Sequence, residues 1–163
     1  MITLTETGPR GLYFEEFEQD KTMVTPARTI TEADIVQFAG LTGDYNPMHV
    51  DADYAANTMM GARIAHGMLT VSYAMGQAYQ LGLIQKTVLA FRGIEMKFSA
   101  PVYIGDTIRS ELKVAETKPA KRLGGGIVTL EIRIKNQDDK VVQKGKLIIL
   151  VMSKPDDSDA EET

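Results

Sequence analysis

The stretch Gly67–Gln85, GMLTVSYAMGQAYQLGLIQ, contains no charged residue and decides how the rest of the chain must fold. A membrane-spanning helix needs about 20 mostly apolar positions, whereas this stretch is interrupted by glycine and glutamine at Gly76, Gln77 and Gly82, among others. A helix without a charged face is instead typical of a protein core. The stretch therefore predicts a long helix that begins at about Gly67 and is buried against the other elements.

Downstream of Lys86 the hydrophobic period changes to two. Apolar and polar residues alternate over 94–98, 107–114 and 128–135, and the last segment, 141–152, becomes apolar on both faces from Leu147 onward. This alternation is expected of half-buried antiparallel strands. The segment 136–140 has the composition of a hairpin turn. No helix follows Gly124–Gly126, so these glycines indicate a tight turn or bulge entering a strand rather than a phosphate loop.

Upstream of the uncharged stretch the chain is mainly helical. After a short extended segment at 23–30, Thr31 is a predicted N-cap for a helix that ends near Gly43. Asp51 is a predicted cap for a short helix through Ala56. Helices followed by a meander of strands predict an α+β fold, with one antiparallel sheet wrapped around a long central helix. We expect a single domain over residues 1–152 and an acidic, disordered tail over 153–163.

The composition of the chain limits which binding partners and which cellular compartment we expect for the protein. The chain has 163 residues, a net charge of -4 and no cysteine. Nothing in this balance favours nucleic acid or an anionic membrane as a partner, and thiolate chemistry is excluded. The segment 1–10 carries Glu6 and no apolar run, so we expect no signal peptide and a cytoplasmic location. No cofactor is expected.

The chain has only two histidines, His49 and His66. His49 follows Asp44 by five positions in a loop that Gly43 and Pro47 constrain, and such a loop can present a carboxylate and an imidazole to one small volume. That combination is suited to general acid–base catalysis. Two simpler interpretations stay open: Asp44 as an Asx-turn residue, and His49 as an ordinary, partly buried histidine.

A metal site formed by Asp44, His49, His66 and Asp51 is disfavoured, because nothing in the sequence fixes a tetrahedral or octahedral ligand set. We therefore expect no metal at this loop. His66 precedes the predicted central helix, and it is interpreted either as a capping or packing residue or as a direct contact to substrate.

The segment Phe38–His49, FAGLTGDYNPMH, resembles the signature of the MaoC-like, R-specific enoyl-CoA hydratases. The resemblance continues in Ala65–Leu69, AHGML, and in the later segments Phe98–Val102 and Gly105–Ile108. It extends from about residue 14 to residue 152. The combination is far more specific than any one of these motifs alone.

The resemblance implies the hot-dog fold, in which a sheet wraps a long helix. It also implies that Asp44 and His49 are catalytic, that the backbone N–H of Gly67 is an oxyanion donor, and that Asn46 and His66 support the site. The implied reaction is reversible hydration of a 2-enoyl-CoA thioester to the R-3-hydroxyacyl-CoA. The implied assembly is a homodimer or a multiple of dimers.

Three further interpretations remain open at this stage. The basic residues Lys118, Lys121 and Arg122 are candidate contacts for the phosphates of CoA, although a solvated charge cluster explains them equally well. A hot-dog thioesterase and a non-catalytic acyl-thioester binding module would share the fold, which does not by itself determine function. The Asp-X-Asn-Pro-X-His loop favours the hydratase over both.

Overall fold

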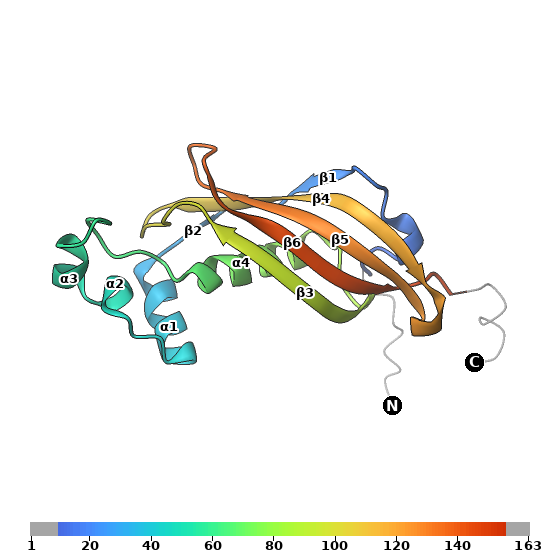
Figure 1. The fold of residues 1–163 in the computed structure, drawn as a ribbon, viewed down its shortest axis with the longest axis horizontal. Helices are drawn as coiled ribbons and strands as arrows, with labels where there is room; N and C mark the ends of the chain where they lie inside the picture. The colour runs from blue at the N-terminus through green and yellow to red at the C-terminus, as the bar shows by residue number, and fades with distance from the viewer. Residues whose placement is uncertain (1–9, 156–163) are drawn as a thin grey trace, which may run out of the picture.

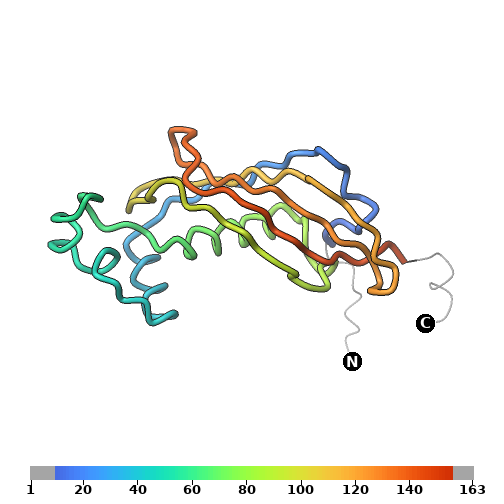
Figure 2. The backbone as a smooth tube through the Cα atoms, viewed as in Figure 1, coloured from blue at the N-terminus to red at the C-terminus, as the bar shows by residue number. Residues whose placement is uncertain are grey.

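The structure is a computed structural model that describes residues 10–155. The predicted domain over 1–152 is thus described from residue 10 onward. We predicted an acidic, disordered tail over 153–163. Of this tail, residues 156–163 lie outside the described residues. Figures 1 and 2 show one elongated, curved sheet with a helix along its inner side and a group of short helices beyond one end.

The sheet is antiparallel and has the strand order β1-β4-β5-β6-β3, with the short β2 pairing separately with β4. The elements in chain order are η1 (Phe14–Glu16), β1 (Thr22–Val24), β2 (Arg28–Thr29), α1 (Glu32–Thr42), α2 (Pro47–Val50), α3 (Ala52–Ala56), α4 (Gly67–Gln80), β3 (Val88–Phe98), β4 (Thr107–Ala120), η2 (Lys121–Leu123), β5 (Gly125–Lys135) and β6 (Val141–Met152). The helices followed by long strands confirm the predicted α+β order.

Helix α4 is the predicted central helix, and it begins at Gly67 as expected. It ends at Gln80, before the uncharged stretch does, because Gly82 adopts the left-handed conformation with a φ of 73°. The helix buries Leu69, Ala74 and Ala78 in a core that the inward side chains of β4, β5 and β6 complete. Among the residues that the structure describes, no helix is both long and apolar enough to cross a membrane.

The predicted caps and turns are confirmed. The Thr31 side chain accepts a hydrogen bond from the backbone of Asp34 at the start of α1, and Gly43 closes this helix with a φ of 77°. Asp51 caps α3 by accepting from the backbone N–H of Tyr54 at 2.9 Å. Gly124, which has a φ of 77°, makes the tight turn that enters β5.

Strand β3 is less buried than its alternating pattern suggested. Ile94 is 42% exposed and Phe98 is 54% exposed, although both lie on the apolar face of the strand. The cause is topological: among the described strands, β3 pairs only with β6 and forms one edge of the sheet. The apolar face of this edge therefore extends beyond the surface that α4 covers.

Asp34 joins the neighbouring elements β2 and α1 to helix α4, which is distant from them in sequence. Its carboxylate accepts hydrogen bonds from the Tyr73 hydroxyl of α4 at 2.6 Å and from the Arg28 guanidinium of β2 at 2.8 Å. It also accepts from the backbone N–H of Thr31 at 2.8 Å, which completes the capping box of α1. The guanidinium of Arg28 lies 3.9 Å from the centre of the Tyr73 ring. This cluster holds α1 against α4.

Burial disfavours the charged form of Asp34, but the hydrogen bonds from Tyr73, Thr31 and Arg28 outweigh it and lower the pKa of Asp34 to about 2. Burial and the bond to Asp34 also raise the pKa of Tyr73 to about 12. A carboxyl whose pKa is depressed by folding contributes stability that is present above its unfolded pKa of about 3.9 and lost as the pH falls through the folded value.

We predict that Asp34→Asn removes about 2 kcal/mol of unfolding free energy at pH 6 and that this difference shrinks as the pH falls from about 4 to 2. Urea unfolding of both proteins over this range measures the difference, and the exposed Asp53→Asn is the control. A difference that stays constant over the whole range would show that the Asp34 carboxylate is not stabilised in its ionised form.

Candidate active site

A cavity of about 700 Å³ lies at the end of the sheet where α4 begins. The loop after α1, helix α2, the first residues of α4 and the chain after β3 form its wall. Most lining side chains are apolar, and the polar groups include those of Asp44, His49, His66 and Gln143. A few polar groups converging in an apolar pocket are typical of a small-molecule site.

Asp44 enters the cavity directly after the left-handed turn at Gly43. Its Oδ1 accepts from the backbone N–H of Asn46 at 3.2 Å, so the Asx-turn interpretation is confirmed. The Asn46 side chain in turn accepts from the backbone N–H of Met48 at 3.3 Å and caps α2. Asn46 thus shapes the loop, while Asp44 is exposed and keeps its second carboxylate oxygen available at the cavity.

His49 is 7% exposed and lies on α2. Its Nδ1 is 2.7 Å from the carbonyl oxygen of Ile64. A carbonyl oxygen can only accept, so Nδ1 carries a hydrogen in this pair, and Nε2 of the neutral ring is left as an acceptor. The backbone of Ile64 therefore selects the tautomer of His49 that can take up a proton at Nε2.

His66 is 3% exposed and lies directly before α4. Its ring stacks on the ring of His49 with centroids 3.8 Å apart, and the Phe38 ring lies 5.1 Å away. Its Nε2 is 2.9 Å from the backbone oxygen of Asp44, whereas its side chain makes no hydrogen bond that caps α4. The packing interpretation is confirmed, and this bond ties the Asp44 loop to the start of α4.

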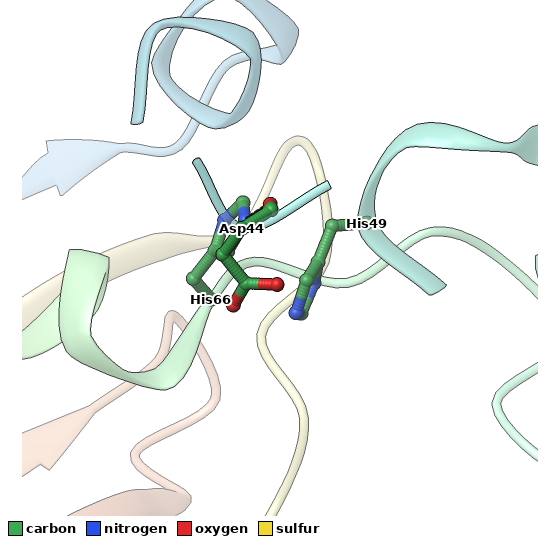
Figure 3. Close-up of side chains that lie close together, drawn as sticks. All are labelled: Asp44, His49 and His66. Atoms are coloured by element: carbon green, nitrogen blue, oxygen red, sulfur yellow. Dashed lines mark hydrogen bonds between the residues drawn. The ribbon is translucent and has the colours of Figure 1, made fainter. Parts of the chain in front are cut away.

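Figure 3 shows Asp44, His49 and His66 together, and one nitrogen or oxygen atom from each lies within 4.8 Å of the others. Two hydrogen bonds from one water span about 4.5 Å, so a single water can bridge the Asp44 carboxylate and the His49 ring. Asp51, the fourth residue of the disfavoured metal set, caps α3 instead.

The same three side chains are the group of described residues that could hold a metal ion. The two imidazole planes, however, are stacked with centroids 3.8 Å apart and inclined by only 28°, so the lone pairs of their nitrogens lie in two separate, nearly parallel planes. Metal ligation by two histidines requires lone pairs that converge on one point. The geometry therefore suits a hydrogen-bonded water better than an ion.

Gly67 is the first residue of α4 and lines the cavity. Because no side chain of His66 caps this helix, the N-terminal turn leaves backbone N–H groups for a ligand, and the helix dipole favours negative charge there. A β-carbon at this position would lie 2.6 Å from Cε1 of Phe98, so any larger residue would have to displace the Phe98 ring. The N-terminus of α4 can thus support charge on a ligand oxygen.

Sequence analysis missed Gln143 as a residue of this site. It lies on β6, is 2% exposed, and its amide Nε2 donates to the backbone oxygen of Gly67 at 3.2 Å. The sequence did contain a signal for it. Gln143 is an even number of positions from Leu147 and Ile149, so in an extended strand it points to the same inward face as they do. The basic candidates of the strand region, at positions 118, 121 and 122, do not line the cavity, and Figure 1 places the β4–β5 turn at the opposite end of the sheet.

The chain matches the family model for the MaoC-like domain over residues 15–136. It is 35% identical to an (R)-specific enoyl-CoA hydratase of Rhodospirillum rubrum over 144 residues, which cover 85% of this chain and 91% of that protein. It is also 43% identical over 105 residues to protein MaoC of Klebsiella aerogenes, which cover 64% of this chain but only 31% of that longer protein.

A solved R-hydratase from Pseudomonas aeruginosa superposes with a TM-score of 0.75 at 33% identity, covering 88% of each chain. The expected hot-dog fold is thereby confirmed. The family-model match, the alignment over most of the length of the Rhodospirillum rubrum relative and the structural superposition agree. The chain belongs to the MaoC-like dehydratase family.

Proposed function

We propose that this protein catalyses the reversible addition of water to a 2-enoyl-CoA thioester, giving the R-3-hydroxyacyl-CoA. The observation that carries the proposal is the juxtaposition of the Asp44 carboxylate and the His49 ring within 4.8 Å, beside the uncapped start of α4. The relative named as an (R)-specific enoyl-CoA hydratase, at 35% identity over most of both chains, supports the same reaction.

The two polar side chains are suited to hold one water in a reactive orientation. A carboxylate oxygen of Asp44 and Nε2 of His49, in the tautomer that the Ile64 carbonyl selects, are both acceptors at the cavity, so the water donates both hydrogens and directs a lone pair toward C3 of the enoyl group. An imidazole is a better proton acceptor near neutral pH than a carboxylate. We therefore assign the base to His49 Nε2 and the stabilisation of the resulting imidazolium to Asp44 and the Ile64 carbonyl.

The reaction balances without a cofactor. The water oxygen bonds to C3 while its proton moves to His49, and the π electrons move through C2 to the thioester oxygen. The backbone N–H of Gly67 is suited to stabilise that oxygen, and an oxyanion donor of this kind typically contributes about 10²–10³-fold in rate. The proton then passes from His49 to C2, which restores the neutral ring and completes the 3-hydroxyacyl thioester.

We predict that Asp44→Asn and His49→Gln each lower the hydration rate by about 10²–10⁴-fold, because each removes one of the two groups that act on the water. The loss of absorbance of crotonyl-CoA measures the rate, and circular dichroism reports folding. The matched control is Asp53→Asn, an exposed carboxylate of the neighbouring helix α3. Variants that both keep activity within a few-fold contradict the assignment, and release of free thiol by the wild type indicates a thioesterase instead.

A second prediction concerns stereochemistry. If one water serves both as nucleophile and as the source of the returned proton, hydroxyl and proton must reach the same face of the double bond. Hydration of crotonyl-CoA in deuterated water should therefore proceed by syn addition, and the (R)-specific relative leads us to expect the R product alone. Chiral analysis and NMR of C2 read the two features separately. Anti addition or a racemate would falsify the shared-water geometry, and an S product would contradict the proposed R-specificity.

The proposal includes a homodimer that covers the exposed edge of the sheet. Strand β3 exposes Phe91, Ile94 and Phe98, and α4 exposes Met68 and Tyr79. An unpaired sheet edge with an apolar face is normally covered in native proteins. Pairing of two β3 edges would extend the sheet and bury these apolar side chains.

We predict that light scattering at micromolar concentration gives the mass of a dimer or a multiple of dimers. Ile94→Lys should shift the protein toward monomer, because it places a charge on the apolar face of β3. Lys97→Glu, on the opposite face of the same strand, serves as the control and should stay assembled. A fully active wild-type monomer would contradict the dimer.

A further inference from the structure

Gln143 carries a buried acceptor that no residue in the described part of the chain uses. The bond from its Nε2 to the Gly67 backbone oxygen determines the orientation of the amide, because that oxygen can only accept. Its Oε1 is buried and receives no hydrogen bond from any of the described residues 10–155. A buried acceptor without a donor costs free energy, so one that belongs to a residue lining the cavity is a candidate contact for a ligand.

The position of Gln143 determines which part of a ligand it can meet. It lies across from Phe98 in the β3–β6 register, and both side chains pack against Gly67 at the start of α4. Gln143 therefore contacts the same residue whose backbone N–H we assign to the thioester oxygen. The Asp44–His49 pair lies on the loop side of the cavity and handles the C3 end of the acyl group.

Building on the proposed function, we propose that Gln143 Oε1 accepts a hydrogen bond from the first amide N–H of the pantetheine arm. This N–H belongs to the cysteamine unit, which a short flexible link joins to the thioester, so it is the donor nearest the carbonyl that Gly67 binds. CoA and acyl-carrier proteins present this same unit. Gln143 is then a binding residue for the thiol carrier rather than for the acyl chain.

The neutral amide of glutamine suits this role. A neutral acceptor satisfies an N–H donor without placing a charge in the apolar cavity, which already holds the Asp44 carboxylate. The other buried acceptor at this cavity, Nδ1 of His66, is enclosed by the stacked ring of His49 and the nearby ring of Phe38. Gln143 is therefore the better placed of the two for a bond to the arm.

The test pairs one change in the protein with one change in the substrate. The proteins are the wild type and Gln143→Met, which keeps similar volume and removes the amide. The substrates are the crotonyl thioester of N-acetylcysteamine and its analogue in which an ester oxygen replaces the amide N–H. We expect Gln143→Met to lower kcat/KM about tenfold for the amide substrate and less than twofold for the ester. Gln37→Met, an exposed residue of α1, is the control and should change neither.

Equal losses on both substrates would mean that Gln143 only positions Gly67, and this result overturns the inference, as does no loss on either. If the variant does not fold, the wild type alone decides: equal kcat/KM for the amide and the ester overturns the proposed bond. A wild type that fails to hydrate crotonyl-CoA itself overturns the proposed function and the inference with it. The two failures are thus distinguishable.

Discussion

The burial of α4 against the inner face of the curved sheet is the constraint on which the other features of the molecule depend. The helix fits there because it carries no charge and presents small residues such as Ala74 and Ala78 to the core. Its position also determines where its N-terminus lies. Since the helix begins at the cavity without a side-chain cap, its dipole is available to a ligand rather than to the protein.

The N-terminus of α4 supplies backbone groups to the cavity, and the segment between α1 and α2 adds the carboxylate of Asp44. The Asp34 cluster holds α1 against α4, and the bond from His66 to the Asp44 backbone oxygen joins the end of that segment to the start of α4. The Asp34 cluster and the His66 hydrogen bond therefore both restrict the position of this loop. The carboxylate of Asp44 therefore reaches the cavity although the residue itself is exposed and lies in an Asx-turn.

Inside the cavity, backbone carbonyl groups orient the rings of both histidines. Ile64 and the backbone of Asp44 each hold one ring nitrogen, so each ring has a defined tautomer and only one nitrogen left over. One nitrogen of the His49 ring lies within 4.8 Å of an Asp44 carboxylate oxygen, and the remaining nitrogen of His66 is buried. The apolar wall strengthens these polar interactions, because fewer waters compete for the same donors and acceptors.

The sequence by itself determined the longer helices, the strands and their order, and it singled out the residues between α1 and α3, although it placed His49 in a loop where the structure has the short helix α2. Hydrophobic period, caps and glycines act over a few neighbouring positions, so the starts of α1, α3 and α4 and the alternating strands could be predicted, and the loop motif pointed to Asp44 and His49. Only the tertiary structure decided which edge of the sheet stays uncovered, that Asp34 bonds Tyr73, that the Ile64 carbonyl selects the His49 tautomer, and that Gln143 lies against Gly67. Those contacts join residues far apart in sequence, and their partners depend on strand order and helix packing rather than on local propensity.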